Sequence, residues 1–312
     1  MKVALAQIAP IWLDRNATLE KVATWMQDAA KQKCSLVAFG ETLVPGYPFW
    51  LSNTDGARFD SAFQKEIHAR YLDQAVCIEE GHLDAICQLA SQLKIETLIG
   101  CYERPVGRGG HTGYASLVRI SATGEIENIH RKLVPTYEER LAWGQGDGHG
   151  LGVFRLGQFT VGGLNCWENW MPLARAALYA QGENLHVAVW PGCKRNTIDI
   201  TRFVALESRS YVLSVSGVLS KSDIPDSMPQ RELIIESSPD VFADGGSCIA
   251  APDGSWVIEP VDSTEQLLVA ELDFEMVLRE RQNFDPSGHY SRPDVTELVV
   301  NRKRQSIVRL QD

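Results

Sequence analysis

The chain has 312 residues, of which 44% are hydrophobic and 22% are charged, close to the averages of globular proteins. This length is enough for a large buried core, and the composition excludes long disordered or fibrous stretches. With 30 Lys and Arg against 40 Asp and Glu, the net charge of −10 disfavours a nucleic-acid-binding surface and favours small-molecule chemistry.

Short apolar runs alternate along the chain with segments of helical spacing, which is typical of buried strands interleaved with helices in a layered α/β or α+β fold. The chain opens as a β-α-β unit, with a strand over residues 5–8, a helix over 19–30 and a strand over 36–39. Later strands are predicted over residues 97–102, 115–120, 160–165, 185–190, 212–218 and 267–272. Later helices are predicted over residues 61–77, 83–93, 173–180 and 201–211, and the polar segment 223–240 is predicted to be an extended loop.

No linker and no internal repeat divides the sequence, so residues 1–312 are expected to form a single domain. Residues from about 275 to 312 form a tail of mixed composition, for which subunit contacts are expected. The N-terminal segment lacks a signal-peptide pattern, and no apolar run reaches the roughly 18 residues that a membrane span requires. Seven cysteines without a C-x-x-C pair or zinc-type cluster indicate reduced thiols and a cytoplasmic protein.

Polar residues occur at three points where a buried run stops, and α/β folds usually bind ligands at such strand ends. Glu41 leaves the strand at 36–39 into a loop with two prolines and two glycines. It is expected either to be a general base with a raised pKa or to cap backbone amides. Residues 130–140 form a charged, folded-back loop, in which a lysine and a carboxylate converge on one point or form solvated ion pairs.

The third segment passes from a strand through a sharp turn into a predicted helix and resembles a nucleophile elbow that carries Cys166. A thiol at a helix N-terminus beside a cation is expected to have a lowered pKa, whereas the alternative is a buried structural cysteine. None of the seven histidines lies in a pattern typical of a Cys-His pair. A Glu-Lys-Cys set supplies the needed parts, because Glu takes the thiol proton, Lys stabilises developing charge and the thiolate attacks carbon.

Three long motifs carry a family resemblance: F-G-E-T-L-V-P-G-Y-P, H-R-K-L-V-P-T-Y-E-E-R-L-A-W-G-Q-G-D-G and N-C-W-E-N-W-M-P-L-A-R, in that order. The chain resembles a nitrilase of the carbon-nitrogen hydrolase superfamily, and the similarity extends to G-H-Y-S-R-P-D near the end. One departure is Gly40, where the family usually has proline. The resemblance implies a four-layer α-β-β-α sandwich, two of which pair through helices into an eight-layer α-β-β-α-α-β-β-α dimer or a larger homo-oligomer.

The resemblance also implies roles for individual residues. The general base falls on Glu41, the lysine on Lys132 and the nucleophile on Cys166. A second glutamate falls on Glu139, with Glu138 as the alternative if the register is shifted by one. Residues on the catalytic loops that are expected to line the substrate pocket are Tyr47, His130, Trp143, Trp167, Trp190 and Pro191.

The activity implied is hydrolysis of a small organic nitrile to a carboxylic acid and ammonia through a thioimidate and a thioester, with neither a metal nor an organic cofactor. Three alternatives use the same fold: an amidase or carbamoyl-amide hydrolase, a cyanide-degrading enzyme, and a catalytically silent small-molecule binder. The segments W-E-N-W-M-P-L-A-R and G-H-Y-S-R-P-D favour the nitrilase branch over the amidases.

Overall fold

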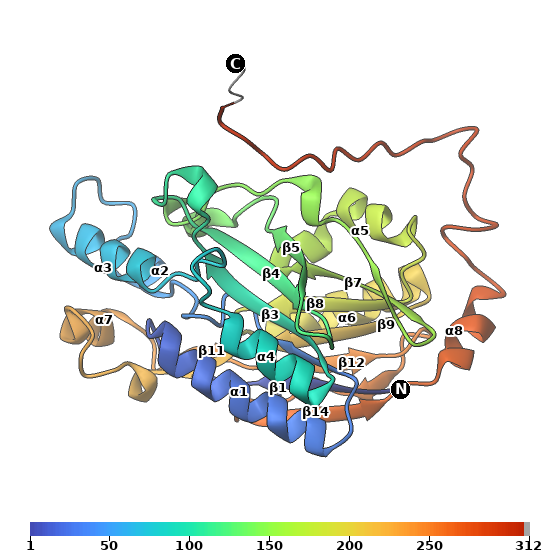
Figure 1. Cartoon of the computed structure of the whole chain (residues 1–312), viewed down its shortest axis with the longest axis horizontal. Helices are drawn as coiled ribbons and strands as arrows, with labels where there is room; N and C mark the ends of the chain where they lie inside the picture. The colour runs from blue at the N-terminus through green and yellow to red at the C-terminus, as the bar shows by residue number, and fades with distance from the viewer. Residues whose placement is uncertain (309–312) are drawn as a thin grey trace.

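Two six-stranded sheets lie face to face in the computed structural model, which describes residues 1–308 (Figure 1). The first sheet has the order β14 (Gln266–Glu271), β1 (Lys2–Gln7), β2 (Leu36–Phe39), β3 (Glu96–Glu103), β4 (Tyr114–Ile120) and β5 (Ile126–Arg131). The second has the order β13 (Trp256–Ile258), β12 (Cys248–Ala250), β9 (Tyr211–Ser216), β8 (Leu185–Trp190), β7 (Phe159–Asn165) and β6 (Phe154–Leu156). A separate pair is formed by β10 (Val218–Ser220) and β11 (Val241–Asp244). Both large sheets mix parallel and antiparallel neighbours.

Helices cover the outer face of each large sheet. The helices are α1 (Arg15–Lys31), α2 (Trp50–Asn53), α3 (Ala62–Asp73), α4 (Asp84–Leu93), α5 (Pro172–Tyr179), α6 (Lys194–Ser208), α7 (Arg231–Ser237) and α8 (Phe274–Arg281). Helices α1 and α4 pack side by side on the first sheet, and α5 and α6 pack on the second (Figure 1). The resulting order of helix, sheet, sheet and helix confirms the predicted four-layer α-β-β-α sandwich.

The strands are apolar on both faces because each face is covered. In β1, Val3 and Leu5 lie in the core between the sheets, whereas Ala4 and Ala6 lie in the core under α1 and α4. Full burial of one aliphatic side chain contributes about 1.5–3 kcal/mol, so these alternating contacts fix which face of the strand points inward. Helix α1 begins after Asp14, whose carboxylate accepts a hydrogen bond from a backbone N–H in the first turn.

The predicted strands with continuous apolar runs agree with the structure, and β2 and β8 have the predicted bounds. The helix predicted over 201–211 instead spans Lys194–Ser208, because Arg209 adopts a left-handed conformation that ends it. The segment 223–240 was expected to be a loop, but it contains α7. Strand β5 was not predicted, because it lies at a sheet edge and alternates polar with apolar residues.

The segment after α8 runs without helix or strand along the periphery of the molecule (Figure 1). Its residue Arg304 donates hydrogen bonds to Asp147 at 3.0 Å and to the carbonyl of Ile129 at 2.8 Å, so this part of the tail returns to the same chain. The last four residues of the predicted 275–312 tail lie outside the described residues. Within residues 1–308, no helix is both long enough and apolar enough to cross a membrane.

Candidate active site

Glu41 lies in the turn that directly follows β2. Its backbone N–H donates to the carbonyl of Trp190 at 3.0 Å, which ties the turn to the end of β8 in the other sheet. A Cβ on Gly100 of β3 would lie only 2.1 Å from the carbonyl oxygen of Gly40, so glycine is needed where this turn crosses β3. The Glu41 side chain is buried, with 2% of its residue surface exposed.

Lys132 follows β5, and backbone hydrogen bonds fix it on both sides. Its N–H donates to the carbonyl of Ala115, and its carbonyl accepts from Gly146, each at 2.8 Å. Glu139 lies on a short 3₁₀ helix, Tyr137–Leu141, whose start is stabilised by a capping box between Thr136 and Glu139. These contacts place both side chains in the interior.

Cys166 directly follows β7 and has a backbone φ of +49°, in the left-handed region that is costly for residues other than glycine. It begins a 3₁₀ helix, Cys166–Trp170, and the longer α5 starts only at Pro172. A strained conformation costs about 1–3 kcal/mol and persists only when its surroundings enforce it. The strand and sharp turn were predicted, whereas the helix at this point is a 3₁₀ turn.

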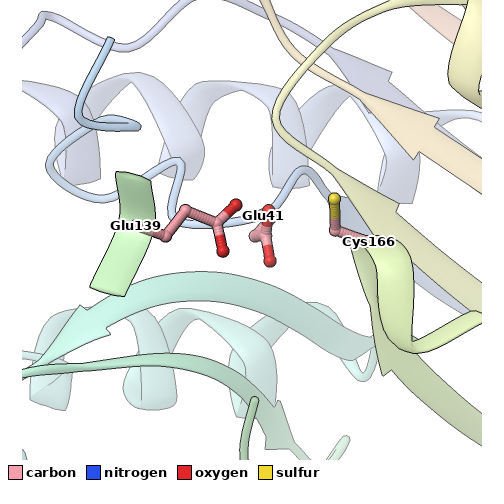
Figure 2. A group of neighbouring side chains, drawn as sticks. All are labelled: Glu41, Glu139 and Cys166. Carbon is pink, nitrogen blue, oxygen red and sulfur yellow. The ribbon is translucent and has the colours of Figure 1, made fainter. Parts of the chain in front are cut away.

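Glu41, Glu139 and Cys166 converge from three separate segments (Figure 2). One carboxylate oxygen of each glutamate and the Cys166 Sγ all lie within 4.8 Å of one another. Lys132 Nζ lies 2.9 Å from Glu41 Oε1 and 2.7 Å from Glu139 Oε2. The lysine ammonium therefore occupies the position between the carboxylates that a metal cation would otherwise take.

Burial dominates the protonation of this cluster. It raises the pKa of Glu41 to about 8, although the Lys132 charge opposes the shift. Burial also raises the pKa of the Cys166 thiol well above its ordinary value, which outweighs the attraction of Lys132. The lowered thiol pKa expected from a helix N-terminus is therefore wrong for this closed site.

The raised pKa of Glu41 favours transfer of the thiol proton from Cys166, whereas the raised pKa of the thiol opposes it. A carboxylate with a raised pKa is a stronger base than an ordinary one, so it takes a thiol proton at lower cost. Burial alone would lower the pKa of Lys132, but the negative charges of Cys166, Glu41 and Glu139 raise it above its ordinary value. Lys132 thus stays a cation throughout.

Glu139, rather than Glu138, faces the cluster. Tyr47 donates its hydroxyl hydrogen to Glu139 Oε1 at 2.7 Å, while the other oxygen of Glu139 meets Lys132. Glu138 lies instead in a surface groove beside Tyr137. The structure therefore brings together the four side chains that the resemblance implies, with Glu139 and not Glu138 as the second glutamate. The other three are Glu41, Lys132 and Cys166.

Three of the residues predicted to line the substrate pocket lie beside the cluster. Tyr47 and Trp143 border the cluster, since their rings meet edge to face at 5.4 Å and Lys132 Nζ lies 5.3 Å from the Trp143 ring centre. Pro191 lines a small cavity of about 10 Å³ together with Glu41 and Tyr47, which is room for about one water molecule.

The other predicted pocket residues lie elsewhere. The Trp190 ring is fully buried in a core cluster that also contains Cys166, and it donates to Ser214 Oγ at 3.3 Å. Its carbonyl accepts from the Glu41 N–H. Trp167 has 47% of its surface exposed, and its ring lies beside that of Trp170. Its backbone N–H, by contrast, contacts the Cys166 sulfur. His130 turns toward another carboxylate, described next.

Glu168 joins the turn that carries Cys166 to the loop that carries Lys132. Sequence reasoning missed this residue. One of its oxygens accepts from the Leu133 N–H at 2.6 Å and the other from the Asn165 N–H at 2.8 Å. His130 Nε2 lies 3.0 and 3.2 Å from the two oxygens. Because Leu133 follows Lys132 and Asn165 precedes Cys166, this carboxylate sets the spacing of the two segments that carry Lys132 and Cys166. The only signal in the sequence is the capping-box spacing from Asn165 to Glu168.

Replacing Glu168 by glutamine should lower the free energy of unfolding by about 1–3 kcal/mol, because an amide group would then face a buried backbone N–H. Any hydrolytic activity of the cluster should fall as well, since the spacing of Lys132 and Cys166 is disturbed. Urea denaturation measures the first effect, and Glu275→Gln on the exposed face of α8 is the matched control. Equal stability of the two variants would contradict this role for Glu168.

Comparison with known proteins finds relatives that match nearly the whole chain. The family described as carbon-nitrogen hydrolase matches residues 2–282. Nitrilase 2 from an unidentified prokaryote is 34% identical over 99% of this chain and 95% of its own length. An aliphatic nitrilase of Rhodococcus rhodochrous is 32% identical, over 99% of this chain and 81% of its own length.

A solved structure shares the fold. The crystal structure of a carbon-nitrogen hydrolase from Helicobacter pylori G27 superposes with a TM-score of 0.68 at 18% identity, covering 94% of this chain and 96% of that one. The family match spans most of the chain, and both sequence relatives exceed 30% identity over nearly its full length. The chain therefore belongs to the carbon-nitrogen hydrolase family of enzymes, and nitrilases are among its relatives.

Proposed function

We propose that this protein is a nitrilase, which hydrolyses an organic nitrile to a carboxylic acid and ammonia. The observation that supports the proposal is the buried cluster in which Lys132 Nζ meets Glu41 at 2.9 Å and Glu139 at 2.7 Å, beside the Cys166 thiol. It contains a nucleophile, a base and a fixed cation, the three groups needed to add water across a carbon-nitrogen bond. The sequence relatives named nitrilases favour a nitrile as the substrate.

In the first step, Glu41 takes the proton of the Cys166 thiol and the thiolate adds to the nitrile carbon. One π bond of the nitrile breaks, and its electron pair moves to nitrogen, which is protonated to give a thioimidate. The Lys132 ammonium and the Trp167 N–H stabilise the charge that develops on nitrogen. The raised pKa of Glu41 suits it to pass the proton from sulfur to nitrogen.

In the next steps, Glu41 removes a proton from a water molecule, which adds to the thioimidate carbon. The tetrahedral intermediate expels ammonia, after the nitrogen has gained a further proton, and leaves a thioester on Cys166. A second water hydrolyses the thioester, which releases the carboxylic acid and restores the thiol. If the intermediate expels sulfur instead of ammonia, an amide is released, so some amide by-product is expected.

Ammonia release by the purified full-length protein tests the proposal. The panel comprises aliphatic, aromatic and arylacetonitriles, cyanide and the matching amides, with Cys166→Ala as the blank. Release from organic nitriles supports the proposed activity, and the ranking identifies the substrate class. Release from amides alone, or from cyanide alone, would replace nitrilase by one of those activities. No release from any compound would favour a silent binder and overturn the proposal.

We also propose that two copies pair through α5 and α6. The outer surface here carries apolar side chains that are 41 to 68% exposed: Trp167, Trp170, Leu173, Ile198, Phe203 and Leu206. A contiguous apolar patch of this kind marks an interaction surface and supports the eight-layer dimer. The exposed tail after residue 275 is proposed to add contacts between subunits. Light scattering should give at least twice the chain mass of 34.6 kDa, and a monomer would contradict the pairing.

The seven cysteines are all free, which supports a reducing, cytoplasmic location for the enzyme. Fractionation of cells that produce the protein, followed by detection of the chain, tests this assignment. Recovery outside the cytoplasm would contradict it.

A further inference from the structure

A buried polar chain lies directly behind the turn that carries Cys166, and the chemistry above does not use it. His186 of β8 places Nδ1 2.8 Å from Glu183 Oε1 and Nε2 2.7 Å from Asn169 Oδ1. Asn169 Nδ2 in turn donates to the carbonyl of Cys166 at 2.8 Å. Glu183, His186 and Asn169 are each at most 1% exposed. A chain of polar groups thus leads from Glu183 to the backbone of the nucleophile.

The hydrogen-bond pattern fixes the direction of each contact. Asn169 Nδ2 faces two carbonyl oxygens, those of Cys166 at 2.8 Å and Leu164 at 3.4 Å, so the nitrogen of the amide must point there. Its oxygen then faces His186, and an amide oxygen only accepts. His186 Nε2 must therefore carry a hydrogen, and a second hydrogen lies between Nδ1 and Glu183 Oε1, 2.8 Å apart, which holds the opposite side of the ring. The imidazole thus sets the orientation of the Asn169 amide.

The fold reserves space for this arrangement. A Cβ on Gly162 of β7 would lie 2.1 Å from Glu183 Oε1, so the carboxylate occupies the space where a side chain would otherwise be. Arg281 of α8 donates to the backbone carbonyl of Glu183 and so holds the residue from the other side. Burying three polar side chains behind a catalytic turn costs stability unless their partners are satisfied, which favours a specific task for them.

We propose that His186 is a positioning residue for the nucleophile: with Glu183 it orients Asn169, which holds the Cys166 carbonyl and with it the strained turn that aims the thiol at Glu41. Glu168 holds the turn at the Asn165 N–H, and Asn169 holds it at the Cys166 carbonyl. Two contacts are needed because the φ of +49° at Cys166 relaxes if either end is released. The proposal rests on the function proposed above, in which Cys166 is the nucleophile.

Two substitutions of His186 separate positioning from simple packing. His186→Gln places its amide nitrogen near the former Nε2, where it can donate to Asn169. His186→Asn reaches only the former Nδ1 position, so it leaves Asn169 Oδ1 without a donor. Both variants replace the imidazole ring with a neutral amide. Any effect that comes only from loss of the ring is therefore the same in both. The measurements are kcat and KM on a nitrile that the wild type hydrolyses, and the rate at which iodoacetamide alkylates Cys166, followed by peptide mass.

For His186→Asn we expect kcat and the alkylation rate to fall about tenfold to a hundredfold, because small misplacements of reacting groups have effects of this size. KM should stay within about twofold, and His186→Gln should keep kcat within about threefold of the wild type. Equal losses in the two variants, or a loss only in KM, would overturn the proposal. His82→Asn is the control, since His82 accepts a hydrogen bond from the Cys77 N–H away from the catalytic turn, and its rates should match the wild type.

A second variant covers the case in which His186→Asn does not fold. Asn169→Asp keeps an acceptor for His186 but turns an oxygen, instead of an N–H, toward the Cys166 carbonyl. It should show the same fall in alkylation, and a wild-type alkylation rate would overturn the proposal. If no nitrile is hydrolysed even by the wild type, the proposed function fails, while the alkylation rates still decide the role of His186.

Discussion

Replacing Cys166 by alanine should abolish ammonia release from nitriles, with a loss of at least about 10⁴-fold, because no other group can form the covalent intermediate. The free energy of unfolding should change by no more than about 1 kcal/mol, since only one buried sulfur atom is lost. After incubation with substrate, the wild-type peptide that contains Cys166 should carry an acyl or imidate adduct by mass spectrometry. The variant peptide should carry none.

Cys34→Ala is the matched control, because Cys34 is also a buried free thiol but packs under the helices on the outer face of the first sheet. It should retain the wild-type rate. More than about 1% of the wild-type rate in Cys166→Ala would place the nucleophile on another residue and remove the basis of the proposed reaction.

Replacing Lys132 by methionine should both inactivate and destabilise the protein. The side chain is 1% exposed and lies between two buried carboxylates, so its loss leaves them without a cation. Removing one partner of a buried ion pair typically costs about 3–5 kcal/mol. Without the attraction of Lys132, the pKa of Glu41 rises further, so an even smaller fraction of Glu41 is ionised at neutral pH and able to take the thiol proton. Activity should fall by at least about 10³-fold.

The pH dependence of stability gives a separate test of the Lys132 variant. A carboxylate whose pKa is raised on folding binds its proton more tightly in the native state, so stability falls as pH rises from the unfolded pKa toward the folded one. Glu41 keeps its proton up to about pH 8 in the wild type and to a higher pH in the variant, so the destabilisation of Lys132→Met relative to the wild type should grow as the pH rises above about 8. Urea denaturation below and above this pH measures it.

Lys194→Met is the control for Lys132→Met. Lys194 forms an exposed ion pair with Asp262, and exposed pairs contribute only about 0–1 kcal/mol. Its stability should stay near the wild type at every pH. If Lys132→Met were as stable and as active as this control, the lysine would be neither the stabilising cation of the cluster nor part of the reaction.

Sequence reasoning located the elements whose signal is local. Strands β2 and β8 are continuous apolar runs buried on both faces, and their bounds agree with the prediction. Strand β5 alternates polar and apolar residues at a sheet edge, and α7 lies in a polar segment, so neither carries a pattern that composition alone identifies. The catalytic candidates were found because each lies within one of the three long motifs that carry the family resemblance.

What sequence reasoning missed depends on contacts between distant segments. Glu168 accepts a hydrogen bond from Leu133, 35 positions away, and His186 contacts Asn169 from a neighbouring strand. Neither contact can be predicted from the local sequence pattern. The raised pKa of Cys166 was also missed. The argument from a helix N-terminus uses only local structure, whereas burial of the thiol depends on the whole fold. His130 was expected to line the substrate pocket, but the structure turns its ring toward Glu168.

The proposed catalytic groups come from both sheets of the sandwich. Glu41 and Lys132 follow β2 and β5 of the first sheet, whereas Cys166 follows β7 of the second. A refolding chain that has formed either sheet alone therefore has only part of the catalytic set, however complete its secondary structure is. Catalytic activity during refolding thus reports the docking of the two sheets, a late event built on contacts that are distant in sequence, and circular dichroism should recover before it.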